Sequence, residues 1–331
     1  MAQTLTSALA ETHHLLALAS DIDSREIALL ASTRWRRVEQ AMGEISVSRY
    51  SSLFGPYTVG AGLGASLGLP RGLHQAWIAN TLTERGEPPL PGSLDPTGVS
   101  RTFPSGLPVR EERRVVDFLV AAARRLGGVV RFHGTGLMVA PVPDGALDLS
   151  VYSPLWLEPD AALVTARSVV PRFELAIDWH AFVPEDCAPP ASQPDYLDLS
   201  LELEPDQRTD LLARAAAHDR ATLSGEQSLD RFALTADLGP AGTLVIEISG
   251  VEQPPGALRE VGWAEQGAVE YRVRWIPLEP SHLLMEFPPA GHCLARAQMA
   301  NLLAGIARVV HHTVGGEVLD SDGFPIDPAD L

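Results

Sequence analysis

Aspartate, histidine and cysteine residues occur at two places where they could supply acid–base or nucleophilic chemistry. Asp178 and His180 lie at the end of a predicted strand, and His292 directly precedes Cys293 at the start of a predicted helix. A thiol near a helix N-terminus has a lowered pKa and is a better nucleophile. With His133 as a further base, these residues give one hypothesis: a hydrolase-type enzyme whose site lies between the two halves of the chain.

The spacing of these residues does not require an active site. The sequence has no CxxC, HxH or HExxH pattern, so we predict no metal site, although Cys187 could join the same group. It also has no GxSxG or Walker A pattern. Burial or helix capping explains each histidine and cysteine without chemistry, and we favour that interpretation.

A glycine-rich segment, residues 55–72, is the candidate for binding a cofactor. The window GAGLGA, residues 60–65, fits a relaxed dinucleotide-binding pattern with Ala65 in the last position. Its backbone at Gly60, Gly62 and Gly64 is the candidate, and Arg71 could supply a charge to a phosphate. That pattern works where a strand leads into a helix whose N-terminus holds the pyrophosphate. Here the sequence LPRG at 69–72 stops any helix after about one turn, so we predict a flexible loop and no cofactor.

The segment LDSDGF, residues 319–324, contains the acidic spacing of a calcium loop but cannot complete one. A loop beginning at Asp320 needs a glutamate at its twelfth position, where the sequence has Leu331. Asp-Gly between two short β-type runs instead predicts a tight hairpin turn.

Composition restricts the classes of function. The chain has 331 residues, 42 acidic and 25 basic, with a net charge of −17, and so lacks the basic face that a nucleic-acid binder needs. An acidic surface suits a basic protein partner. Two cysteines, an N-terminus without a basic start and the absence of an apolar run of about 20 residues predict a cytoplasmic protein that does not bind membranes.

Two stretches of the chain read as copies of one unit. Residues 115–141 and 301–328 each contain an apolar helical run with an arginine near its end, then Gly-Gly, a short β-type run, a second glycine turn and a proline. The glycine pairs 127–128 and 315–316 predict helix ends, because glycine adopts the left-handed conformation that closes a helix.

Periodicity and turn residues predict the remaining elements. Predicted helices cover 2–19, 24–42 (capped by Asp23 or Ser24), 73–85, 110–126, 204–218 and 294–313. Predicted strands cover 129–132, 137–140, 147–152, 173–179, 196–203, 232–237, 243–249, 269–276 and 282–287. Residues 86–108 are too rich in proline and glycine for regular structure, and 183–195 has the composition of a linker.

These elements predict an α+β fold of two similar two-layer units, each an antiparallel sheet with helices on one face in a ferredoxin-like style. The first domain would span 1–185, including the N-terminal helices, and the second 195–331. We expect a non-catalytic protein that binds a protein partner or a small-molecule ligand, with the enzyme described above as the alternative.

Overall fold

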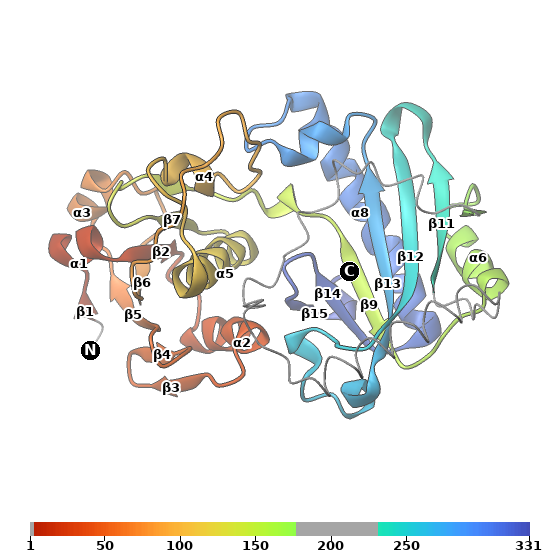
Figure 1. Cartoon of the computed structure of the whole chain (residues 1–331), viewed down its shortest axis with the longest axis horizontal. Helices are drawn as coiled ribbons and strands as arrows, with labels where there is room; N and C mark the ends of the chain where they lie inside the picture. The colour runs from red at the N-terminus through yellow and green to blue at the C-terminus, as the bar shows by residue number, and fades with distance from the viewer. Residues whose placement is uncertain (1–2, 177–230) are drawn as a thin grey trace, which may run out of the picture.

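The computed structural model describes residues 3–176 and 231–331. They form two antiparallel sheets with several helices, a mixed α+β architecture (Figure 1). We call residues 3–139, which carry the first sheet, the first half. Residues 149–176 and 231–331, which carry the second sheet, are the second half.

The first sheet has the strand order β3-β4-β5-β6-β2-β7-β8. These pairings are antiparallel, and β1 adds to β5 in parallel. The strands are β1 (Gln3–Thr4), β2 (His14–Leu18), β3 (Glu39–Ala41), β4 (Glu44–Ser46), β5 (Ser52–Thr58), β6 (Gln75–Asn80), β7 (Val129–Arg131) and β8 (Met138–Val139).

The second sheet has the strand order β10-β11-β12-β13-β9-β14-β15, and all of these pairings are antiparallel. The strands are β9 (Leu149–Ser153), β10 (Glu174–Ala176), β11 (Arg231–Asp237), β12 (Thr243–Val251), β13 (Ala268–Ile276), β14 (Glu317–Asp320) and β15 (Pro325–Ile326). Residues 149–176, which the sequence analysis placed in the first domain, therefore contribute two strands to the second sheet.

Strand β2 in the first half and strand β9 in the second half are each followed by a helix, and each half has a longer helix before its last hairpin. In the first half these are α2 (Ser24–Arg34) and α5 (Arg110–Leu126), and in the second half α6 (Pro159–Arg167) and α8 (Ala290–Val314). Short helices are α1 (Ser7–Thr12), α3 (Ala61–Ser66) and α4 (Val99–Thr102). Strands β2 and β9 occupy corresponding places in their sheets, because β2 lies between β6 and β7 and β9 lies between β13 and β14.

The two long helices end at the predicted glycine pairs. Gly127 closes α5 with a φ of 65°, and its N–H donates to Ala123 O. Gly315 closes α8 with a φ of 66°, and its N–H donates to His311 O. Positive φ is unfavourable for residues with a Cβ, so glycine is the residue that ends both helices in this way. This prediction is confirmed.

Helices cover both faces of the first sheet, which corrects the expectation of one covered face. On one face α2 and α5 pack over β2 and β6 through Leu16, Trp77 and Leu119. On the other face a smaller cluster contains Leu15 and Ile78 with residues of α1 and α3. In the second half, α6 and α8 cover one face. The segment 252–267 packs against part of the other face.

Two predicted helices contain residues that instead form central strands. The predicted helix 2–19 is correct for residues 7–12, which form α1, but residues 14–18 are β2. Residues 75–80 of the predicted helix 73–85 are β6. Every residue of β2 is buried, and so are five of the six residues of β6. A strand covered on both faces has a continuous apolar run, which periodicity cannot distinguish from a buried helix.

Two smaller differences concern the end of one predicted helix and the type of one predicted strand. The predicted helix 24–42 begins as expected with Asp23 as its N-cap but ends at Arg34, and β3 follows. The predicted strand 282–287 is instead a 3₁₀ helix at Pro280–Leu284 followed by irregular chain. The predicted linker 183–195, strand 196–203 and helix 204–218 lie outside the described residues.

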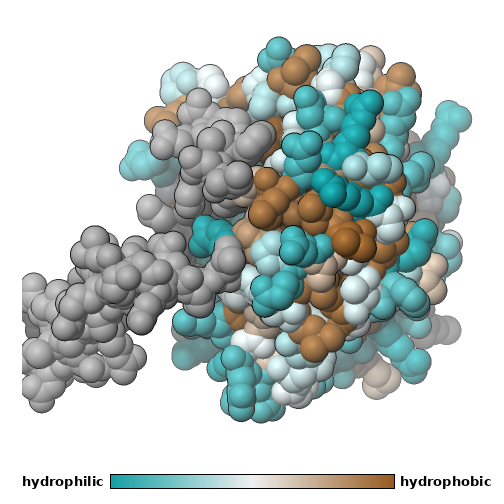
Figure 2. Space-filling model, turned by 90° about the vertical axis from the view of Figure 1, so that its right-hand side faces the viewer, coloured by the Kyte–Doolittle hydropathy of each residue, from teal (hydrophilic) through white to brown (hydrophobic). Residues whose placement is uncertain are grey.

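The side of the second half that carries α6 displays a group of apolar residues surrounded by hydrophilic ones (Figure 2). α6 packs on α8 and buries Ala162 and Ala166, while Val164 stays exposed. Within the described part of the chain, no helix has both the length and the apolar character needed to cross a lipid bilayer.

Candidate functional site

The tip of the last hairpin inserts into the first half. Phe324, between β14 and β15, is fully buried in the first-half core, with its ring centroid 6.4 Å from that of Phe118. The Arg34 guanidinium lies 5.6 Å from the centroid of the Phe324 ring. Arg34 also donates to the Asp322 carbonyl, and the Asp322 carboxylate pairs with Arg124 of α5. The hairpin therefore belongs to the sheet of one half and to the core of the other.

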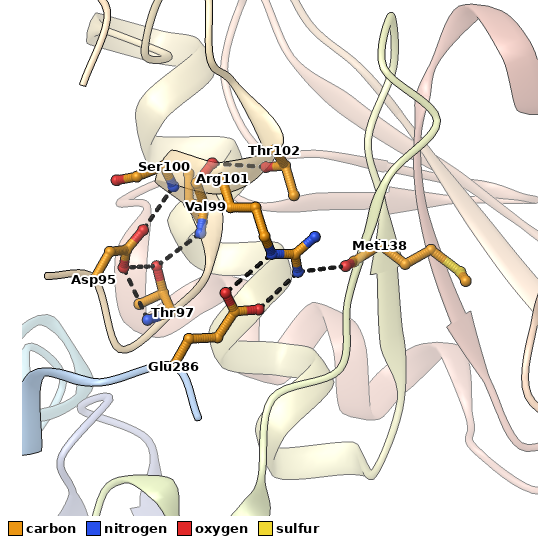
Figure 3. Close-up of polar contacts among 8 residues, drawn as sticks. All are labelled: Asp95, Thr97, Val99, Ser100, Arg101, Thr102, Met138 and Glu286. Carbon is orange, nitrogen blue, oxygen red and sulfur yellow. Dashed lines mark hydrogen bonds and ion pairs between the residues drawn. The ribbon is translucent and has the colours of Figure 1, made fainter. Parts of the chain in front are cut away.

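A second contact joins the connector before α5 to the connector before α8 (Figure 3). The Asp95 carboxylate accepts hydrogen bonds from Thr97 N at 2.8 Å and Ser100 N at 2.6 Å, which fixes the first turn of α4. Arg101 of α4 then forms two hydrogen bonds with Glu286, of 2.6 and 3.0 Å. Burial of the Asp95 carboxyl opposes its ionisation, but the hydrogen bonds from Ser100 and Thr97 outweigh burial, and the pKa of Asp95 is lowered.

Gly98 allows this contact to form. Its φ is +73°, and a Cβ at this position would lie 2.3 Å from Oε1 of Glu286. Any larger residue would therefore displace the Glu286 carboxylate from Arg101. The hydrogen bond that Arg101 donates to Glu286 raises the pKa of Arg101, so the guanidinium group stays charged.

A cavity of about 320 Å³ lies between these two contacts, at the junction of the halves. Its charged lining residues are Arg101 (α4), Arg124 (α5), Arg296 (α8) and Glu286. Its apolar lining includes Met138, Val142, Leu283, Met285 and Phe287. A neighbouring cavity of about 350 Å³ shares Arg124 and Ala146 with it and extends to the turn of the last hairpin.

Two of the cavity arginines each keep one buried N–H group without a partner. Nη1 of Arg124 pairs with Asp322, and Nη2 of Arg296 lies 3.2 Å from Asp144 Oδ1. The Nε atoms of both arginines are buried, and within the described part of the chain neither has a hydrogen-bond partner. The Arg296 side chain is only 8% exposed. Buried N–H groups are nearly always satisfied in folded proteins, so two of them around one cavity call for an explanation.

Of the predicted catalytic residues, His292 and Cys293 lie on α8 near this cavity but do not line it. The His292 ring is buried against Trp275 and His282, at centroid distances of 5.3 and 5.4 Å. Burial, followed by the charge of Arg296, lowers the pKa of His292, so the ring is held neutral. The Cys293 thiol donates to Pro288 O at 3.8 Å.

Within the described part of the chain, the side chains of His292 and Cys293 form no hydrogen bond with another candidate catalytic residue. Asp178, His180 and Cys187 lie outside the described residues, so the enzyme alternative stays a prediction. Within residues 3–176 and 231–331, no three histidine, cysteine, aspartate or glutamate side chains lie close enough to hold a metal ion.

His133 belongs to a different cluster, built around a buried carboxylate. Glu112 is fully buried and accepts from His14 Nε2 at 3.0 Å, Arg85 Nη1 at 2.6 Å and Glu84 N at 2.7 Å. The N–H of His133 donates to His14 Nδ1 at 3.1 Å, which leaves the proton of a neutral His14 on Nε2. His14 and Glu112 together resemble a catalytic dyad, but within the described part of the chain the hydrogen bonds of their side chains are with each other and with neighbouring protein groups. These bonds connect β2, α5 and the segment before α5.

The glycine-rich candidate does not form a phosphate cradle. Gly60 is the N-cap of α3, and Gly62 and Gly64 lie within this six-residue helix. Gly60, Gly62 and Arg71 are exposed. α3 packs through Leu63 on the outer face of the first sheet, so the segment acts as a cover for that face.

The cavity arginines were not among the predicted site residues. Arg101, Arg124 and Arg296 come from three segments far apart in the chain, and no spacing links them. The repeated unit does mark Arg124, as an arginine near the end of its helical run, but nothing in the sequence shows that Arg296 faces it. No protein-family model, no curated protein and no solved structure matches this chain.

Proposed function

We propose that this protein is a non-catalytic binding protein whose cavity between the two halves receives a small ligand with an anionic group. The observation that carries the proposal is the gathering of three guanidinium groups, those of Arg101, Arg124 and Arg296, in the lining of one cavity. The Nε–H groups of Arg124 and Arg296 are buried and have no acceptor within the described part of the chain, and a buried donor without an acceptor costs about 1–3 kcal/mol. A carboxylate or phosphate in the cavity would accept hydrogen bonds from the guanidinium groups, and a shift of the two side chains would bring their Nε–H groups within its reach.

The donor groups support an anionic ligand. The chain carries a net charge of −17, yet three guanidinium groups gather at this cavity, each paired with one carboxylate (Glu286, Asp322 or Asp144) and each with further N–H groups. Charge-assisted hydrogen bonds from arginine to an oxyanion are stronger than neutral ones. The cavity volume of about 320 Å³ also lies within the range of small-molecule sites.

The lining residues favour binding over catalysis. Cysteine, histidine and serine are absent from the described lining, and the Thr97 hydroxyl already donates to Asp95 at 2.5 Å. Glu286 is held by Arg101. The prediction of a basic protein partner has no separate support at this cavity.

The test observes the arginine N–H groups directly by NMR of the Nε–Hε resonances. Titration with acetate and citrate at constant ionic strength should shift the resonances of Arg124 and Arg296. Exposed Arg308, on the same helix α8, should not respond. Arg296→Lys assigns its resonance, keeps the charge beside Asp144 and removes the Nε donor. Arg308→Lys is the matched control.

The expected result is a saturable shift of the Arg124 resonance. The affinity obtained from this titration should fall at least about fivefold in Arg296→Lys and stay unchanged in Arg308→Lys. Equal responses from Arg308, or no response at either cavity arginine, would overturn the proposal.

We also infer that the two halves are copies of one ferredoxin-like unit with additional strands at both edges of its sheet. The corresponding strand orders, the two helices in corresponding places and the glycine-terminated long helices support this inference. A related chain that consists of one such unit alone would strengthen it, whereas related single units with a different strand order would contradict it.

A further inference from the structure

An apolar groove lies beside the cavity, on the other side of the Arg101–Glu286 pair. It has a volume of about 480 Å³, and its apolar lining includes Leu90, Leu94, Leu284, Met285 and Phe287. Leu90 and Phe287 are each 78% exposed, and Leu94 is 52% exposed. Single exposed apolar residues are common, but several that line one hollow mark a binding surface.

The groove and the cavity are neighbours. Arg101, Met285, Glu286 and Phe287 line both of them, so the two hollows lie on either side of one short segment. Both residues of the Arg101–Glu286 pair, which Figure 3 shows, line the cavity and the groove, and Asp95 lines the groove. A ligand that fills both would place its charged end near Arg124 and Arg296 and its apolar end against Phe287 and Leu94.

We infer that the ligand is an aliphatic carboxylic acid, such as a free fatty acid of medium chain length. This inference rests on the proposed function, because the same two arginines bind the charged group. The carboxylate has two oxygens, one for the cavity-lining guanidinium group of each of these two arginines, and the ion pairs of these groups with Asp322 and Asp144 hold them in place. The hydrocarbon chain would cover the exposed apolar residues of the groove.

The test measures affinity by isothermal titration calorimetry for hexanoate, octanoate and decanoate below their micelle concentrations, with decanol as the uncharged ligand. Affinity should rise up to about fourfold for each methylene that becomes buried. Decanol should bind at least about tenfold more weakly than decanoate, because it cannot form charge-assisted hydrogen bonds.

Variants separate the two ends of the ligand. Arg296→Lys should weaken decanoate at least about fivefold and leave decanol unchanged. Leu90→Ser should reduce the gain per methylene without changing the acetate-induced shifts at Arg124, because Leu90 lines the groove and not the cavity. Leu278→Ser is the matched control, since Leu278 is 70% exposed and does not line the groove.

The outcomes distinguish this inference from the proposed function. If acetate and citrate shift the arginine resonances but affinity does not depend on chain length, the apolar chain is wrong and the anion site stands. If octyl phosphate binds more tightly than the matching carboxylate, the carboxylate assignment is overturned. If no anion shifts the arginine resonances, both proposals fail.

Discussion

Glu112 and His292 are each the third residue of the long helix of their half, and both are buried, but only Glu112 has all its polar atoms bonded. Three donors surround the Glu112 carboxylate. His292 Nε2, one turn before Arg296, has no partner within the described part of the chain. Glu112 thus fixes a connector of the first half. The residue at the same helix position in the second half, His292, keeps an unbonded nitrogen one turn from a cavity arginine, and buried polar groups without a partner are rare outside functional sites.

Replacing Glu112 tests the first side of this comparison and should have the largest effect. Glu112→Ala leaves His14, Arg85 and the Glu84 N–H buried without an acceptor, so we expect the free energy of unfolding to fall by about 3–5 kcal/mol. Chemical denaturation followed by tryptophan fluorescence measures it. Glu265→Ala, at an exposed position, should change stability by less than about 0.5 kcal/mol. A loss at Glu112 as small as the control's would show that the cluster does not stabilise the first half.

The two hairpins that follow the long helices offer the next comparison. The β14–β15 tip buries Phe324 in the other half, whereas Leu137, beside the β7–β8 turn, is 41% exposed. Phe324→Ala should reduce the free energy of unfolding by about 3 kcal/mol, because it opens a cavity beside Phe118. Leu137→Ala should cost less than about 1 kcal/mol.

Denaturation curves again provide the measurement. Similar losses for the two variants would show that the last hairpin does not hold the halves together.

The contribution of His292 to the pH dependence of stability should be the smallest of these effects. Its pKa in the folded protein lies below the ordinary value of 6.5, because of burial and then because of Arg296 and His282. Below about pH 6.5 the unfolded chain therefore binds the proton first, and this contribution to stability is lost as the pH falls through the folded pKa. His292→Phe should lose less stability than the wild type between pH 7.5 and pH 5.

His312→Phe is the control, because His312 is exposed on the same helix. If it reduces the pH dependence as much as His292→Phe does, the titration cannot be assigned to the buried ring.

The sequence predicted the elements that have local signals. Gly127 and Gly315 mark helix ends, and Asp-Gly at 322–323 marks the last turn, whose Gly323 N–H donates to Asp320 O. It failed at β2 and β6, because strands buried on both faces lose the alternation that identifies a strand. This burial depends on how α1 and α3 pack on the sheet, which the apolar pattern of the strands does not show.

The candidate site could not be predicted for a related reason. His292 and Cys293 were singled out by residue type, and they lie near the cavity but outside its lining. The cavity is lined by arginines from both halves, Arg101, Arg124 and Arg296, so it depends on the packing of the two halves against each other. Long-range packing of this kind leaves no spacing pattern in a single sequence.

The insertion of Phe324 also sets an order of events during synthesis. Arg124 and Asp322, which pair at the junction, are 198 residues apart in the chain. While a ribosome is still making the second half, the nascent first half has a gap beside Phe118 that only this late aromatic ring fills. The first half thus reaches its final stability only after translation has passed the β14–β15 turn, and until then it is more open to chaperones and proteases than in the finished protein.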